Sequence, residues 1–140
     1  MNRDLQLTKD FSYYEFWSNN FGKPKVEPPE LYFNNIVYIA EQLQFVRDKL
    51  NDDFKPKKEI YILVTSAYRT PEWNASKSVE GANDSKHLRA EAVDSRAVGV
   101  PLFIYWTYLI RYTDFNHLGY YRAKNFVHAG IDDKITVFKY

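Results

Sequence analysis

A helical repeat of apolar residues limits the folds open to this 140-residue chain more than any other sequence feature. The repeated residues are Ile36, Ile39, Leu43, Val46 and Leu50. Because they recur at three- and four-residue steps, they share one face of a helix. Pro29 suits the first turn of this helix, where its missing N–H costs nothing. The polar stretch 51–58, which contains Pro56, is predicted to be a turn. The chain must therefore bury one long amphipathic helix.

Further segments predict the elements against which this helix packs. In residues 59–65, apolar side chains occur at both odd and even positions, which is typical of a central strand covered on both faces. Residues 101–113 are dense in aromatic side chains and predict a buried helix. Three short strand candidates lie at 119–121, 126–129 and 134–138. Ser12 and Glu15 form a capping box that predicts a short helix over 13–18. We expect one α+β domain over 1–140, a small antiparallel sheet packed with helices.

Composition excludes several classes of protein. The chain is 45% hydrophobic and 18% aromatic, which argues against disorder. A net charge of +1 argues against a nucleic-acid partner, and the lack of Cys excludes disulfides and thiolate metal sites. Because no apolar window is long enough for a membrane span and no signal peptide is visible, we expect synthesis in the cytoplasm without a membrane partner. Any metal site must use carboxylates and the three histidines, His87, His117 and His128.

The long segment 66–86 is rich in Ser, Asn, Gly and Pro, and loops of this length are commonly functional. After it, Ala90, Ala92 and Asp94 share one parity of a predicted strand.

Several motifs around this segment occur together in one known family. They are Ser66, Tyr68 and Arg69 after a strand; Ser85, His87, Ala92 and Asp94; Val127-His128 after Gly119-Tyr120-Tyr121; and the opening segment 7–16. With these motifs the chain resembles the zinc D-Ala-D-Ala carboxypeptidase family over about residues 7–132. The fold of that family is shared with the hedgehog signalling domain, and its members cleave bacterial peptidoglycan. The resemblance implies the same fold and a Zn2+ cofactor.

The resemblance implies that His87, Asp94 and His128 bind the metal. Two imidazoles and one carboxylate suit catalytic zinc, which takes three protein ligands and keeps a fourth position for water. Zinc lowers the pKa of that water to about 7 and polarises a carbonyl, as amide hydrolysis requires. The alternative is a surface His–Asp hydrogen bond, with His128 an ordinary strand residue.

Two residues are candidates for binding substrate, and one of them, Arg69, is also named as catalytic. Arg69 can clamp a substrate carboxylate, as the matching Arg does in similar enzymes, or it can pin the loop by pairing with Asp84 or Glu80. Ser85 either hydrogen-bonds substrate or orders the turn before His87. Tyr68 is expected to pack rather than react.

Three positions depart from the family pattern. Ala90 replaces a Gly, Gly130 replaces the Asp of a His-x-Asp ending, and Asn125 stands where related branches carry an acidic general base. An amide cannot take a proton from water. Replacement bases are sought among four carboxylates that no motif places, namely Asp132, Asp133, Glu91 and Asp114; of these we name Asp132 as catalytic. His117 is an alternative base, but is predicted to be an exposed turn residue.

Two functions follow. The first is a zinc peptidase acting on peptidoglycan stem peptides as a D,D- or L,D-carboxypeptidase or endopeptidase. We expect it to be encoded by a bacteriophage and either carried on the virion or released at host lysis. The second is a tail or capsid component that keeps the metal but has lost catalysis. Its 12 Tyr and 10 Phe would then serve contacts with other virion proteins.

Overall fold

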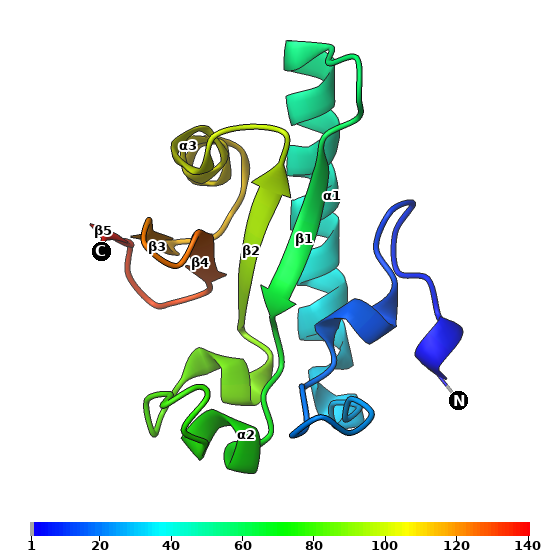
Figure 1. Cartoon of the computed structure of the whole chain (residues 1–140), viewed down its shortest axis with the longest axis vertical. Coiled ribbons are helices and arrows are strands. Elements are labelled where there is room, and N and C mark those ends of the chain that lie inside the picture. Colours follow the sequence, from blue (N-terminus) through cyan, green and yellow to red (C-terminus); the bar gives the residue numbers. More distant parts are fainter. Residues whose placement is uncertain (1) are drawn as a thin grey trace.

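Five strands form one sheet in the computed structural model of the protein, which describes residues 2–140. In chain order the strands are β1 (Tyr61–Ser66), β2 (Ala92–Val98), β3 (His117–Tyr121), β4 (Phe126–Gly130) and β5 (Thr136–Lys139). Their order across the sheet is β1-β2-β4-β3-β5 (Figure 1). The first four strands pair antiparallel, whereas β5 runs parallel to β3. The α+β prediction is confirmed, although one pair of strands is parallel.

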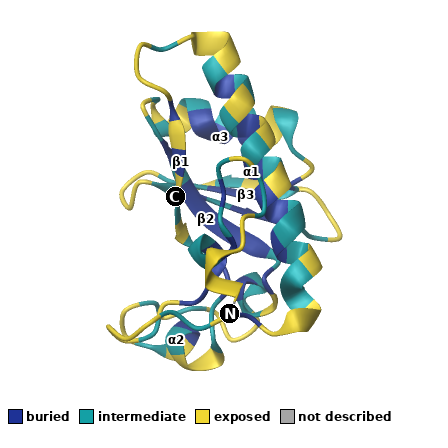
Figure 2. Ribbon diagram, turned by 90° about the vertical axis from the view of Figure 1, so that its right-hand side faces the viewer, coloured by how far each residue is buried: buried dark blue, intermediate teal, exposed yellow. Residues whose placement is uncertain are grey.

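The helices are α1 (Phe33–Phe54), α2 (Pro71–Ala75) and α3 (Leu102–Tyr112), with short 3-10 turns at Asn2–Asp4, Tyr13–Phe16, Glu30–Tyr32 and Lys86–Arg89. One hydrophobic core joins α1 and α3 to the sheet, and Figure 2 shows the buried residues gathered between these layers. The sheet contributes Ile62, Val93, Val127 and Leu118 to this core. Because side chains alternate along a strand, Asp94 and His128 lie on the opposite face. The polar chemistry is therefore separated from the core by the sheet itself.

The long helix predicted from the apolar repeat is α1. All five repeat residues are buried in the core. The helix continues through Phe54, so the prediction of a turn from Asn51 is wrong for its first four residues. The side chain of Asn51 explains this extension: its Nδ2 donates to the carbonyl of Ile60 at 2.9 Å, and its Oδ1 accepts from the Ile60 N–H at 2.8 Å. These two bonds fix the end of α1 against the chain that enters β1.

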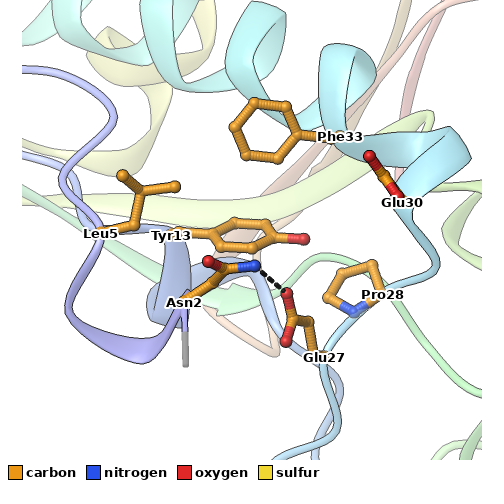
Figure 3. Close-up of a pocket in the computed structure, with 7 residues that line it drawn as sticks. All are labelled: Asn2, Leu5, Tyr13, Glu27, Pro28, Glu30 and Phe33. Atoms are coloured by element: carbon orange, nitrogen blue, oxygen red, sulfur yellow. Dashed lines mark hydrogen bonds between the residues drawn. The ribbon is translucent and has the colours of Figure 1, made fainter.

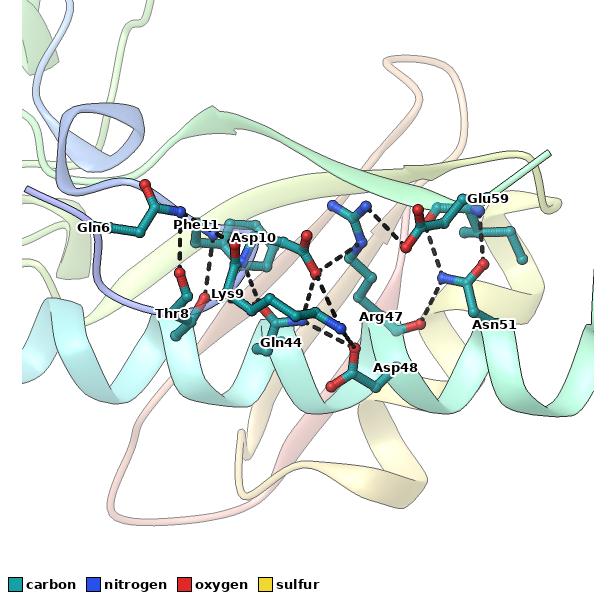
Figure 4. A network of polar contacts seen from close by, with 11 residues as sticks. Gln6, Thr8, Lys9, Asp10, Phe11, Gln44, Arg47, Asp48, Asn51 and Glu59 are labelled. Carbon is teal, nitrogen blue, oxygen red and sulfur yellow. Dashed lines mark hydrogen bonds and ion pairs between the residues drawn. The ribbon is translucent and has the colours of Figure 1, made fainter. Parts of the chain in front are cut away.

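A polar network ties the N-terminal segment to α1 (Figure 4). Gln44 accepts from the Thr8 hydroxyl and donates to Asp10, each at 2.8 Å. Arg47 then links Asp10 at 3.4 Å to Glu59 at 3.2 Å. We call these five residues the α1 network. It joins three segments of the chain that are distant in sequence.

The strand predicted to be central is the edge strand β1. Ile62 is buried in the core, whereas Tyr61 and Leu63 are exposed. The prediction of cover on both faces is therefore wrong, because no helix packs on the outer face of β1 among the described residues. The outer face of an antiparallel sheet can remain in contact with water.

The segment 66–86 contains the short helix α2, which begins at Pro71 with Thr70 as its N-cap. The Thr70 hydroxyl accepts from the Trp73 N–H at 3.2 Å. At the other end of the segment, Ala90 closes the turn Lys86–Arg89 with a φ of 55° and does not belong to the strand, which begins at Ala92. A left-handed backbone conformation favours Gly, which explains why Ala is unusual at position 90.

The remaining predicted elements are found with small shifts. The helix predicted at 13–18 is a 3-10 turn over Tyr13–Phe16, with Glu15 accepting from the Ser12 N–H at 2.7 Å. The predicted buried helix is α3, whose Tyr105 and Leu109 are fully buried. The three C-terminal strands are present as β3, β4 and β5. No helix within residues 2–140 combines the length and apolar character needed to cross a membrane.

Candidate metal centre

His87 is buried, and one nitrogen of its ring is left without a partner. It lies in the turn Lys86–Arg89, where the Ser85 hydroxyl accepts from the His87 N–H at 3.2 Å. Its ring Nδ1 lies 2.6 Å from the carbonyl oxygen of Ala67, so Nδ1 carries the proton and donates. Nε2 of a neutral ring then carries a lone pair. This Nε2 is buried and has no hydrogen-bond partner among the described residues.

The sheet register brings Asp94 and His128 to the same place. Asp94 on β2 pairs directly with His128 on β4 in the antiparallel ladder. Directly opposed residues lie on one face with their Cβ atoms about 5 Å apart. The His128 Nδ1 lies 2.9 Å from Asp94 Oδ1, and His87 Nε2 lies 3.3 Å from the same oxygen. All three side chains thus converge on one point above the sheet.

This convergence fits a divalent cation. One ligand atom from each of His87, Asp94 and His128 lies within 4.8 Å of the others. A buried lone pair at His87 Nε2 that faces a carboxylate oxygen is unfavourable unless a proton or a cation lies between them. Zinc prefers imidazole and carboxylate ligands in a tetrahedral arrangement. The residues predicted to bind the metal are therefore brought together in a donor set that suits zinc.

Arg69 contacts this centre through the Asp94 oxygen that does not face the imidazoles. Its guanidinium donates to Ser66 at 3.0 Å, to Asn74 at 3.2 Å and to Asp94 Oδ2 at 3.2 Å. Asp94 therefore presents one oxygen to Arg69 and the other to the imidazoles. The predicted alternative partners of Arg69, Asp84 and Glu80, do not pair with it. The arginine thus joins Asp94 to Ser66 and Asn74, which lie in the segment 66–86.

Burial and neighbouring charges set the ionisation of this cluster. Burial alone would raise the pKa of Asp94, but the positive charge and N–H donation of the His87 and His128 imidazoles in their protonated form outweigh it and hold that pKa well below its ordinary value. Burial lowers the pKa of Arg69, and the Asp94 carboxylate opposes this shift. Asp94 is consequently ionised at neutral pH, as a metal ligand must be.

Two adjoining cavities open onto the centre, and we call them together the metal cleft. One, of about 220 Å³, is lined by Arg69, Ser85, His87, Asp94, Tyr121, Lys124, Phe126 and His128. The other, of about 330 Å³, is lined by Ala82, Asp84, Ser85, Lys86, His117, Tyr121 and His128. Ser85, Tyr121 and His128 border both cavities. The open side of the centre therefore faces a space that can admit a substrate.

The carboxylates predicted as replacement bases lie outside this lining. The Asp132 carboxylate lies 3.7 Å from Lys86 and accepts from the Asp133 N–H at 2.7 Å, which lowers its pKa. Glu91 pairs with Arg89 at 2.6 Å. Among the described residues, Asp84 is the carboxylate that lines the cleft besides Asp94. Asn125 occupies the β3–β4 turn with a φ of 57°, a left-handed conformation that Asn tolerates better than most residues.

Sequence reasoning named His117 as an alternative base but expected it to be exposed, and it did not place Tyr121 or Lys124 in the cleft. His117, predicted to be an exposed turn residue, is half-buried at the start of β3, and its Nδ1 lies 3.1 Å from His128 Nε2. Tyr121 and Lys124 reach the cleft from the same hairpin. Burial raises the pKa of Tyr121, as do Tyr140 and Asp94. His117 and Tyr121 have the same parity on β3 as Gly119, which pairs with His128, so the register was the missing signal.

A larger cavity of about 620 Å³ lies elsewhere, between the N-terminus and the start of α1. Figure 3 shows its lining, where Asn2 donates to Glu27 at 2.8 Å beside the rings of Tyr13 and Phe33. No His lines this cavity, and its two carboxylates, Glu27 and Glu30, come without a further ligand. The chemistry of the chain is therefore assigned to the smaller metal cleft.

An α+β sheet that holds two imidazoles and one carboxylate beside an open cleft defines a candidate mononuclear metal enzyme. Comparison with protein families gives the same class, because the model of Peptidase M15 matches residues 11–130. The chain belongs to Peptidase M15, a family of zinc-dependent peptidases of the D-Ala-D-Ala carboxypeptidase type. No curated protein matches the chain. Origin in a bacteriophage stays a prediction.

Proposed function

We propose that this protein hydrolyses a peptide bond in the stem peptides of bacterial peptidoglycan, with zinc held by His87, Asp94 and His128. The observation that carries the proposal is the buried, unpartnered Nε2 of His87 facing Asp94 at the floor of an open cleft. Membership of Peptidase M15 supports the reaction type. When bound, zinc would supply Lewis-acid polarisation of the scissile carbonyl and activation of water.

The cleft offers cationic and polar groups for a substrate that carries carboxylates, as stem peptides do. Arg69 is already held by three partners, so we propose that it positions Asp94 and contributes positive potential. Lys124 is exposed at the edge of the cleft and is the residue proposed to attract the substrate carboxylate. Ser85 borders both cavities and is proposed to hydrogen-bond the substrate backbone while it orders the turn before His87.

A proton acceptor is needed because Asn125 cannot act as one. We propose Asp84, since this residue lines the cleft together with Ser85 and His128. Asp132, the base predicted from the sequence, is the alternative: it does not line the cleft, but its carboxylate lies 3.7 Å from Lys86, which does. Substitution of each by Asn separates the two.

The test is a hydrolysis assay with the zinc-loaded protein on purified peptidoglycan and on a synthetic peptide that ends in D-Ala-D-Ala. Products are identified by mass spectrometry, with and without a chelator. We expect a chelator-sensitive product, its loss in His87→Ala, and a fall in kcat of about 100-fold in Asp84→Asn. Asp132→Asn is the matched control and should stay within about threefold of the unmodified chain. The reverse order would assign the base to Asp132.

Absence of any chelator-sensitive product from the zinc-loaded chain would contradict the peptidase proposal. It would favour the second function, a metal-binding module that contacts other proteins of a virion. Exposed apolar side chains such as Phe21, Phe45 and Ile135 would be available for such contacts. Encoding by a bacteriophage, and action on the virion or after lysis, are proposals that extend either function.

A further inference from the structure

We propose that His117 is a positioning residue of the metal centre. By accepting a hydrogen bond from His128 Nε2–H, it holds the His128 ring in the tautomer whose Nδ1 faces the metal. This inference rests on the proposed zinc site, and it adds a fourth residue that does not itself bind the ion. Metal-binding histidines commonly donate their second ring N–H to a fixed acceptor.

The geometry supplies that acceptor. His117 Nδ1 lies 3.1 Å from His128 Nε2, while the other nitrogen of His128 lies 2.9 Å from Asp94 Oδ1. The planes of the two imidazoles are at 90°, with ring centroids 5.1 Å apart. Each nitrogen of His128 therefore has one partner, and the contacts continue from Asp94 through His128 to His117.

The tautomer of His128 follows from this arrangement. A metal binds the lone pair of Nδ1, so the ring proton must be on Nε2. Nε2–H then needs an acceptor on the side of the larger cleft cavity, which both His117 and His128 line. His117 can accept at Nδ1 only when its own proton is on Nε2. Without His117, the ring of His128 loses this restraint, and the tautomer with a proton on Nδ1 competes with metal binding.

The sheet holds His117 in place. On the cleft face, Asp94, His128, Gly119 and Phe138 form one row across four strands. A Cβ at Gly119 would lie only 2.5 Å from the ring of Phe138, so the glycine is what lets that ring lie on β3. Phe138 in turn packs against His117, with ring centroids 5.1 Å apart. His117 thus lies between Phe138 and His128, at a position set by the pairing of β3 with β4.

The test measures zinc affinity by competition with a chromophoric chelator, together with the visible absorption of the Co2+-loaded chain. We expect His117→Leu to weaken zinc binding by about 10–100-fold and to alter the Co2+ spectrum. His117→Asn should remain within about threefold of the unmodified chain, because its side-chain oxygen can accept in place of Nδ1. Phe138→Leu keeps an apolar side chain beside His117 and removes no polar atom, so it should leave the Co2+ spectrum unchanged.

Unchanged affinity and spectrum in His117→Leu would overturn the proposal, as would a Phe138→Leu variant that reproduces both effects. Equal loss in His117→Asn and His117→Leu would also contradict it, because the acceptor would not matter. These readouts are independent of hydrolysis. A chain that binds zinc but cleaves no peptide refutes the proposed peptidase and leaves the role of His117 intact, whereas a chain that binds no zinc overturns both.

Discussion

The α1 network and the metal centre both join distant segments through charged side chains, but they differ in how those charges are matched. In the α1 network, Arg47 lies between the carboxylates of Asp10 and Glu59, and Glu59 is 64% exposed at its side chain. In the metal centre, the Asp94 side chain is only 7% exposed, and one of its oxygens faces two imidazoles. In the first cluster both carboxylates face Arg47, whereas in the second the Asp94 oxygen that faces the imidazoles is not the one paired with Arg69.

This difference separates a structural cluster from a binding site. Exposed ion pairs contribute little to stability, and their charges need no further ligand. A buried carboxylate and lone pairs that converge on one point are unfavourable until a cation joins them. The geometry of the polar groups, rather than their number, therefore marks the metal centre as functional.

The largest expected difference between the two clusters is their response to zinc. Zinc at roughly a thousand times its dissociation constant adds about 4 kcal/mol to the free energy of unfolding. For a domain of this size that corresponds to an increase in Tm of about 10 °C. Thermal unfolding with and without zinc should show this increase in the unmodified chain and in Arg47→Met, but not in Asp94→Asn.

The same increase should disappear as the pH falls from 7 to 5, because protons compete with zinc for imidazole nitrogens. Asp94 does not cause this loss: its pKa lies below the ordinary value, so the carboxylate stays ionised over that range. An increase in Tm that is the same in Asp94→Asn as in the unmodified chain would place the zinc elsewhere.

A smaller difference is expected when the arginine of each cluster is replaced in the metal-free chain. Arg69→Met should lower the free energy of unfolding by about 3 kcal/mol, because it leaves the Asp94 carboxylate buried without its cation. Arg47→Met should cost less, about 1 kcal/mol, because Glu59 is exposed to water and Asp10 keeps the hydrogen bond from Gln44. Urea unfolding at pH 7 measures both. Equal costs would mean that the two clusters do not differ as the structure indicates.

The smallest expected change in the free energy of unfolding concerns Asn74, which accepts a hydrogen bond from Arg69. A Cβ at Gly81 would overlap the side-chain oxygen of Asn74, which accepts from Arg69. Gly81→Ala should therefore destabilise the chain by about 1–2 kcal/mol in urea unfolding, as overpacking does. In an Asn74→Ala background the same change should cost less than about 0.5 kcal/mol, because the two positions are coupled. Additive costs would show that the steric contact is not the cause.

Much of the fold could be predicted from the sequence because its signals are local. The three- and four-residue repeat of α1 and the aromatic density of α3 are properties of single segments. The edge position of β1 could not be predicted, since an apolar run does not show which strands or helices will cover it. The extension of α1 through Phe54 likewise depends on Asn51 meeting Ile60, nine residues further along the chain.

The sequence by itself identified the candidate metal ligands, because the motifs that resemble the zinc peptidase family carry His87, Asp94 and His128. It also revealed that Asn125 cannot serve as a base. Only the tertiary structure decided that Arg69 holds Asp94, that Asp84 lines the cleft and that His117 contacts His128. The physical reason is that these contacts arise from strand register and loop closure, which join residues that no local spacing relates.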